Sequence, residues 1–186
     1  MKKDKWRMLT TRQKIGFIRD YYTIHIVAAL LTLAAVGWAL NHYVINPPPR
    51  TFINISFYGG LVPENMRAEL ATNLTNSLVP DGENYTVMVD NFFVIGDPQF
   101  DMAMTQRMMA MVAASEIDII IFAPGQVYDY IEAGFAAEVY DMADFMYFRD
   151  FARLFDGDFD YWTMIVMTNS RRYDEVRAFF DYIELF

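Results

Sequence analysis

The first strong pattern along the chain is an apolar stretch over residues 22–40, which contains no Asp, Glu, Lys or Arg. At about 1.5 Å per residue, a helix of this stretch would be roughly 28 Å long, close to the thickness of a bilayer hydrocarbon core. Aromatic residues flank it, with Tyr21 at one end and Trp38 and Tyr43 at the other, as is typical of membrane interfaces. The pattern predicts one transmembrane helix, which with its flanks occupies residues 21–45.

The distribution of charge predicts the orientation of this helix. Residues 1–20 hold seven Lys or Arg against two Asp, a net charge of 7 − 2 = +5. The remaining chain holds eight Arg, no Lys and 22 Asp or Glu, a net charge of 8 − 22 = −14. The positive-inside rule then places residues 1–20 in the cytoplasm as a basic tail and residues 51–186 outside the cell membrane. We also expect residues 1–45 to contact membrane lipid, with the basic tail on anionic headgroups.

A cleaved signal peptide is the main alternative to this anchor. Gly37-Trp38-Ala39 offers the small-x-small pattern of a cleavage site. However, the apolar stretch is longer than a usual signal-peptide core, and the basic segment before it is also long. The sequence therefore favours an uncleaved anchor over a signal peptide.

Beyond a proline-rich linker at residues 46–50, strand and helix patterns alternate. Residues 51–58 (TFINISFY) alternate in polarity, and residues 117–122 (IDIIIF) form the short apolar run of a strand covered on both faces. The predicted strands are residues 51–58, 85–95, 117–122, 137–140 and 161–168, and the predicted helices are residues 63–78, 99–115, 126–133, 142–154 and 173–185. This alternation predicts a three-layer α/β domain with a largely parallel sheet over residues 51–186, preceded by the one transmembrane helix.

Composition and motifs point away from several classes of function. The chain has no cysteine, which excludes disulfides, thiolate metal sites and a lipidated cysteine. The acidic domain would repel nucleic acid. The only histidine beyond the apolar stretch, His42, lies beside the membrane, and no nucleotide-binding glycine pattern is present. We therefore predict no enzyme, no catalytic residues and no cofactor.

Two clusters of possible metal ligands have a simpler explanation. Five methionines lie within residues 102–111, and thioethers can bind Cu(I). Helical spacing instead places Met104, Met108 and Met111 on one face, as expected for adaptable core packing. Three aspartates within residues 156–160 lack the further ligands of a calcium loop, which favours a turn. The sequence predicts no metal site.

Two stretches together resemble a known family. Residues 113–135 read AASEIDIIIFAPGQVYDYIEAGF, and residues 166–183 read VMTNSRRYDEVRAFFDYI. They are similar to extracellular solute-binding proteins of the type 2 periplasmic-binding fold, in which an acidic strand leads to a short helix and a glycine, and a later strand ends in Asn-Ser before a helix. The matching positions are Glu116, Asp118, Ile119, Ile120, Gly134, Asn169, Ser170, Phe180 and Tyr182.

The resemblance covers about a third of the domain and implies ligand recognition outside the cell. Two features differ from the family. A membrane segment stands where the family has a lipoprotein cysteine, and residues 51–186 are long enough for only one of the two lobes that close over a ligand. The resemblance therefore implies a reduced, membrane-anchored recognition module.

In open α/β sheets, ligands bind at the carboxyl ends of the strands. This rule selects the loops after the first and third predicted strands, which we expect to lie side by side. The candidate ligand-binding residues are Tyr58, Gly59, Gly60, Ala123, Pro124, Gly125 and Gln126. The acidic surface favours a small neutral or cationic ligand.

A structural subunit of a bacterial envelope complex, with no small ligand, is the alternative function. Aromatic residues are frequent in residues 144–155 (DFMYFRDFARLF), and Phe179, Phe180, Tyr182 and Phe186 cluster near the chain end. Aromatic side chains are enriched both at interfaces and in cores, so they can serve either purpose. An exposed apolar patch would favour the interaction subunit, and a concave pocket at the strand ends would favour ligand recognition.

Overall fold

The computed structural model describes residues 10–153, 159 and 161–185. It divides the chain into two compact units, Met1–Pro48 and Pro49–Phe186. The basic residues among 1–9, the turn predicted at residues 156–158 and the terminal Phe186 lie outside the described residues.

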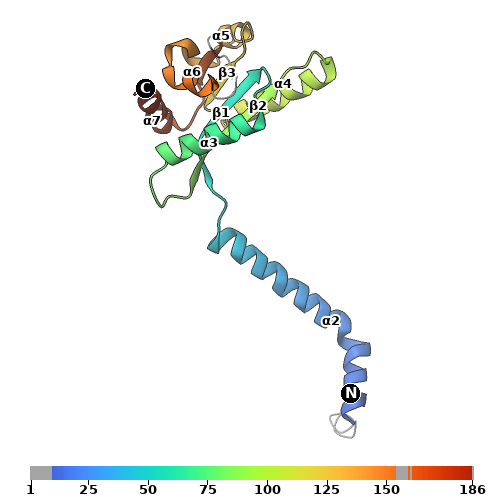
Figure 1. Ribbon diagram of the computed structural model, residues 1–186. Helices are drawn as coiled ribbons and strands as arrows, with labels where there is room; N and C mark the ends of the chain where they lie inside the picture. The colour runs from blue at the N-terminus through green and yellow to red at the C-terminus, as the bar shows by residue number, and fades with distance from the viewer. Residues whose placement is uncertain (1–9, 154–158, 160, 186) are drawn as a thin grey trace. The chain divides into compact units, whose positions relative to one another are not determined.

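The first unit is one long helix, α2 (Thr11–Leu40), followed by a short π-helical turn, η1 (Asn41–Ile45) (Figure 1). Within it, the segment Tyr22–Ile45 is long and apolar enough to cross a membrane, and it is the one such helix in the described part of the chain. At about 1.5 Å per residue it spans roughly 36 Å. A signal sequence near the N-terminus would share these properties. The chain therefore carries one apolar N-terminal helix of membrane-spanning length.

The aromatic end of this helix is ordered by ring contacts. The Trp38 indole stacks on the His42 imidazole at a centroid distance of 5.3 Å, and the Tyr43 ring meets His42 edge-on at 4.8 Å. Apolar side chains such as Leu33 and Val36 are exposed along the same helix. Exposed apolar side chains followed by an aromatic cluster are the pattern expected of a helix that passes from lipid to an interface.

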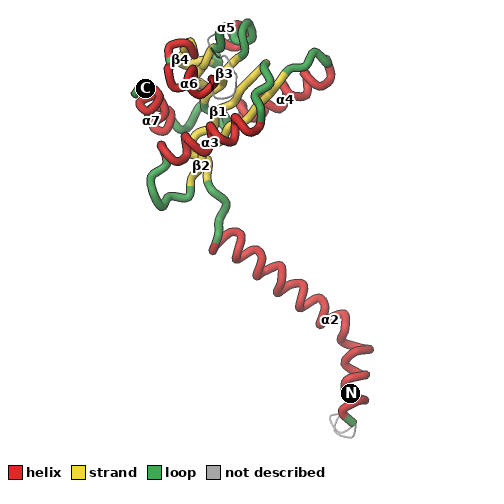
Figure 2. Tube along the Cα trace, viewed as in Figure 1, coloured by secondary structure: helices red, strands yellow, loops and turns green. Residues whose placement is uncertain are grey.

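The second unit is an α/β domain with one five-stranded sheet, coloured yellow in Figure 2. The strand order is β2-β1-β3-β5-β4. The strands are β1 (Arg50–Gly59), β2 (Tyr85–Phe93), β3 (Ile119–Phe122), β4 (Ala136–Asp141) and β5 (Thr163–Met167). β1 begins at Arg50, the last residue of the predicted linker.

In the described part of the domain, five helical segments lie between the strands and a sixth, α7, follows β5. They are α3 (Glu64–Leu78), α4 (Pro98–Ala113), α5 (Tyr128–Glu132), the 3₁₀ turn η2 (Met142–Asp144), α6 (Met146–Arg153) and α7 (Tyr173–Ile183). Local chemistry starts α4, where the Asp97 carboxylate accepts hydrogen bonds from the amides of Gln99 and Phe100 at 2.9 and 3.1 Å, and Pro98 occupies the first turn. The predicted helix at residues 142–154 is divided into η2 and α6.

The core occupies both faces of the sheet. Alternate residues of β3 point in opposite directions, so Ile119 and Ile121 pack with α3, α6 and α7, whereas Ile120 and Phe122 pack with α4 and the α5 region. All four side chains are fully buried. The apolar run of β3 is therefore explained by helices against both faces, as its sequence predicts.

The methionines of α4 contribute to this core unevenly. Met108 is fully buried, and Met109 and Met111 pack partly buried against the same cluster. Met102, nearer the start of the helix, is exposed. Met108 and Met111 lie against the sheet, as the helical spacing predicts, and Met109 packs against the same cluster. The flexible thioether stems fit the irregular space between α4 and the sheet.

The sheet is mixed, which corrects the prediction of a largely parallel one. β1 pairs in parallel with β2 and β3, but β5 runs antiparallel to β3, and β4 runs antiparallel to β5. The chain leaves β3, forms the edge strand β4, and then returns through α6 to insert β5 between them. The prediction failed because β5 is buried along most of its length and so has the same apolar pattern as a parallel strand.

Candidate functional site

The structure brings together the two loops predicted as a binding site. β1 and β3 are parallel neighbours with Tyr58 opposite Phe122. The Ala123 amide donates a hydrogen bond to the Tyr58 carbonyl at 2.8 Å. A Cβ on Gly59 would lie 3.0 Å from the Gln126 side chain. The two loops therefore share the edge formed by the carboxyl ends of β1 and β3, as predicted.

This edge is largely filled by the protein's own side chains. The Tyr58 ring is buried, and its hydroxyl lies 3.0 Å from the Thr105 hydroxyl of α4. A Cβ on Gly60 would overlap the Trp162 indole. Gly59, at φ +92°, adopts a backbone conformation that side-chain-bearing residues rarely take. The two glycines thus allow the protein to pack closely on itself at the position where the sequence predicts a ligand.

One side chain of β2, Asn91, also forms hydrogen bonds with backbone groups at this edge. The Asn91 amide nitrogen donates to the Gly60 carbonyl at 2.9 Å and to the Phe57 carbonyl at 3.3 Å. Its amide oxygen accepts a hydrogen bond from the Val62 amide at 3.0 Å. These bonds occupy the carbonyl groups of Phe57 and Gly60 and the backbone amide of Val62.

The second loop presents a different surface. Pro124, Gly125 and Gln126 are exposed, and Ala123 is half-buried. Only Gln126 among them offers a polar side chain. The cavities described below are lined by other residues. The loops are adjacent as predicted, and their role in ligand binding stays a prediction.

A buried polar cluster lies at the opposite end of β3. The Asp118 carboxylate is fully buried and accepts three hydrogen bonds. The donors are the backbone amide of Asn54 at 2.8 Å, the Ser170 hydroxyl at 2.6 Å and the Arg172 guanidinium at 2.6 Å. The cluster joins β1, the start of β3 and the segment after β5, so one carboxylate connects three parts of the sheet.

This cluster explains two of the positions that carry the family resemblance. Asp118 and Ser170 were both selected by that resemblance, and they bind each other. The sequence does not identify Arg172 as their partner, because nothing in the pattern sets it apart from Arg171 beside it. The Asp118 carboxylate is enclosed, and both its oxygens accept bonds from the protein, so its role here is structural.

A surface groove separates the edge strand β4 from α7. Its volume is about 270 Å³. The lining residues are Ala137, Glu138, Tyr140, Val166, Tyr173, Val176, Arg177 and Phe180. Val176 and Phe180 are buried and give the groove an apolar floor, whereas Glu138 and Arg177 are exposed and bring opposite charges to it.

A short hydrogen bond shapes the strand side of this groove. The Tyr140 hydroxyl donates to the Glu138 carboxylate at 2.6 Å. That bond, with some burial and the nearby negative charge, raises the pKa of Tyr140 to about 12. The Tyr140 ring also packs on Phe180 at a centroid distance of 4.6 Å. Glu138 and Tyr140 therefore form a fixed unit on the face of β4 that is turned toward α7.

The aromatic residues that sequence analysis offered as an interface belong mostly to the core. Phe145, Phe148 and Phe151 are buried, as are Phe179 and Phe180 of α7. They fill the space between the helices and one face of the sheet. A second groove of about 480 Å³ borders this region on α3, α6 and α7. Its lining residues are Asn73, Asn76, Ser77, Tyr147, Asp150, Phe151 and Tyr182.

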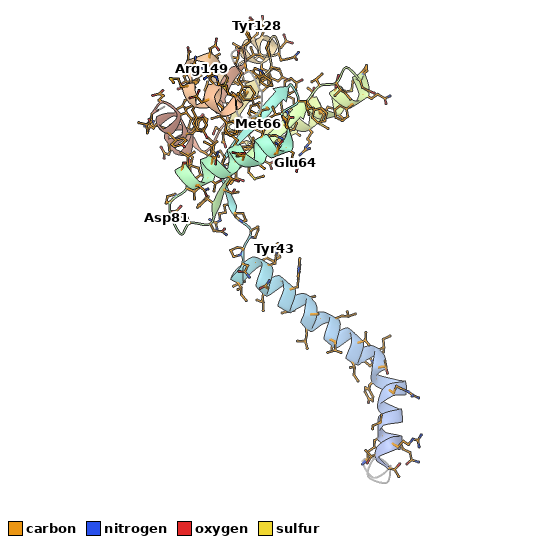
Figure 3. The ribbon with its side chains drawn as sticks, in the orientation of Figure 1. Tyr43, Glu64, Met66, Asp81, Tyr128 and Arg149 are labelled. Carbon is orange, nitrogen blue, oxygen red and sulfur yellow. The ribbon has the colours of Figure 1, made fainter. Side chains whose placement is uncertain are left out.

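Exposed side chains identify the remaining accessible surface. Tyr128 is 73 % exposed and extends from the α5 region at the surface of the domain (Figure 3). Within the described residues, no group of three or more His, Asp or Glu side chains is arranged to hold a metal ion. The features left for recognition are therefore grooves, exposed side chains and strand edges.

Comparisons with known proteins add no further identification. No family model, curated protein or solved structure matches the chain.

Proposed function

We propose that this chain is a membrane-anchored, non-enzymatic interaction subunit whose acidic α/β domain lies outside the cytoplasmic membrane and docks onto an envelope protein. The main supporting observation is the state of the edge formed by β1 and β3. Tyr58, Asn91 and Trp162 fill the place where a small ligand would be expected. A packed edge suits a protein whose partner is bound elsewhere on its surface.

The anchor is supported by charge and length. The apolar helix Tyr22–Ile45 follows a segment, residues 1–20, whose net charge is 7 − 2 = +5. The chain after residue 20 has a net charge of 8 − 22 = −14. The excess of Lys and Arg before the helix favours retention of residues 1–20 in the cytoplasm and translocation of the domain, by the positive-inside rule. An acidic domain of this kind attracts basic partners over long range.

Recognition of a small solute is the second candidate function. The groove between β4 and α7, with its apolar floor and its Glu138 and Arg177 side chains, favours it. The resemblance to solute-binding proteins favours it too. Against it, residues 49–186 form one compact unit, and such proteins close two lobes over their ligand. We therefore place protein docking first.

One experiment separates these functions. The full-length chain would be extracted from its native membranes in mild detergent and weighed intact by native mass spectrometry. We expect the 21.7 kDa chain, uncleaved, in complex with a second polypeptide. The mass of the chain itself reports on the anchor, and the added mass reports on the partner.

Each other outcome contradicts a defined part of the proposal. A chain shortened to begin near Leu40 would mean a cleaved signal peptide. The chain with a small molecule and no second polypeptide would support solute recognition instead. The uncleaved chain alone, under conditions that preserve other envelope complexes, would overturn the docking function.

A further inference from the structure

The outer edge of β4 is available for pairing. Among the described residues, β4 is the last strand of the sheet and pairs only with β5, on its inner side. The Met142 amide donates to the Trp162 carbonyl, and the register places these two residues opposite each other. Because antiparallel ladders alternate, the backbone groups of Tyr140 also face β5, and those of Val139 face outward.

The groove runs beside this edge. On β4, Glu138 and Tyr140 stand opposite Val166 and Met164, so all four side chains share the sheet face that α7 covers. The groove between β4 and α7 is therefore placed to receive the side chains of a strand added along β4. An unpaired edge next to a side-chain groove is the arrangement by which domains bind extended peptides.

We propose that the β4 edge and the groove beside it bind an extended, basic segment of the partner protein as a sixth strand of the sheet. This inference rests on the proposed docking function and names its surface. Backbone hydrogen bonds to the outward groups of Val139 provide affinity, and alternate side chains of the segment enter the groove.

The charge of this edge determines the chemistry of the occupant. Glu138 and Asp141 are exposed on β4, and the strand contains no basic residue. Opposite charges on neighbouring strands stabilise pairing, and like charges directly opposite destabilise it. If a second copy of the chain paired along β4, its acidic residues would face those of the first copy. Both domains are strongly acidic, so the two copies would repel each other. A basic segment removes that repulsion.

Arg177 is the single cation among the groove residues, and it reaches the groove from α7. Within the described part of the chain it forms no ion pair, in contrast to Arg153 and Arg172. Its guanidinium is therefore able to donate hydrogen bonds to carbonyl groups of the added segment. The basic side chains of that segment contact Glu138, on the β4 side of the groove.

The test uses the full chain in nanodiscs of zwitterionic lipid and two synthetic peptides with blocked ends. One peptide alternates lysine with valine, and the other alternates glutamate with valine. We expect the lysine peptide to slow amide hydrogen exchange at Val139 by at least about tenfold, because a new interstrand hydrogen bond protects the amide. The glutamate peptide is expected to leave that amide unchanged.

Charge and backbone variants make the test specific. Glu138→Lys is expected to weaken binding of the lysine peptide by about tenfold or more, because it replaces an attractive cross-strand pair by a repulsive one. Glu69→Lys, at an exposed position of α3, makes the same change in net charge and controls for long-range electrostatic attraction between the domain and the peptide. Val139→Pro removes the outward amide and should abolish protection along β4, whereas Val139→Thr should retain it.

The outcomes separate this inference from the function on which it rests. Equal binding by Glu138→Lys and Glu69→Lys, or peptide-induced protection at β2 instead of β4, would overturn the β4 surface. If the native complex contains a partner and Glu138→Lys leaves that complex intact, the docking function stands and this surface is wrong. If Val139→Pro fails to fold, the comparison of Glu138→Lys with Glu69→Lys still shows whether the peptide binds at β4.

Discussion

Replacing Asp118 with alanine is expected to destabilise the α/β domain by about 3 kcal/mol, because it removes one partner of a buried ion pair. The carboxylate is fully buried and accepts bonds from Asn54, Ser170 and Arg172. Without it, the backbone amide of Asn54 and the Ser170 hydroxyl lose their acceptor inside the core. Buried donors without an acceptor lower the free energy of unfolding. The guanidinium of Arg172 is partly exposed and regains some hydration, which limits the loss.

The chain offers a matched control for this prediction. Asp150 and Arg153 also form an ion pair, at 3.0 Å, but their side chains are 58 % and 68 % exposed. Asp150→Ala is expected to cost at most about 1 kcal/mol, since exposed pairs contribute little. Urea unfolding of both full-length variants in detergent, followed by circular dichroism, measures the difference. Similar losses for the two variants would show that the Asp118 cluster does not hold the sheet together.

Replacing Ile120 with aspartate is expected to have a still larger effect, at least about 4 kcal/mol, and to leave the domain largely unfolded. Ile120 is fully buried at the centre of the sheet, among the residues packed by α4 and α5. A carboxylate at this position has no partner and no access to water. It must either remain charged in an apolar core or be protonated there, and both options destabilise the fold.

Ile95→Asp is the control for this second prediction. It makes the same chemical change at a side chain that is 62 % exposed, in the segment between β2 and α4. We expect a change in unfolding free energy within about 1 kcal/mol, as for most surface substitutions. Thermal unfolding of the two variants provides the comparison. An Ile120→Asp protein that melts with the parent would contradict the central position of β3.

Much of the fold was predictable because its signals are local. Alternation in TFINISFY predicts β1, and the apolar spacing of Met66, Leu70 and Leu74 predicts the buried face of α3. Strand direction is a different matter. β3 and β5 are both short, apolar and buried, yet one is parallel to β1 and the other is antiparallel to β3. The direction of β5 depends on how the chain returns through α6, and this path does not change the pattern of apolar residues within the strand.

The candidate site was predictable in its position but not in its contents. Parallel order alone brings the loop after β1 next to the loop after β3. The groups that fill this edge come from distant segments: Asn91 from β2, Thr105 from α4 and Trp162 from the residue before β5. No spacing rule connects these residues to Gly60, so the sequence could not indicate that the glycine contacts an indole.

The central claim is that the acidic domain lies outside the membrane on an uncleaved anchor, and single-cysteine labelling tests it most directly. The chain has no cysteine, so each introduced thiol is unique. Asp81→Cys lies in the exposed turn before β2 (Figure 3), and Arg12→Cys lies at the basic end of α2. On intact spheroplasts, a membrane-impermeant maleimide is expected to label full-length Asp81→Cys and to label Arg12→Cys only after permeabilisation. Labelling of Arg12→Cys before permeabilisation, with Asp81→Cys protected, would contradict the account.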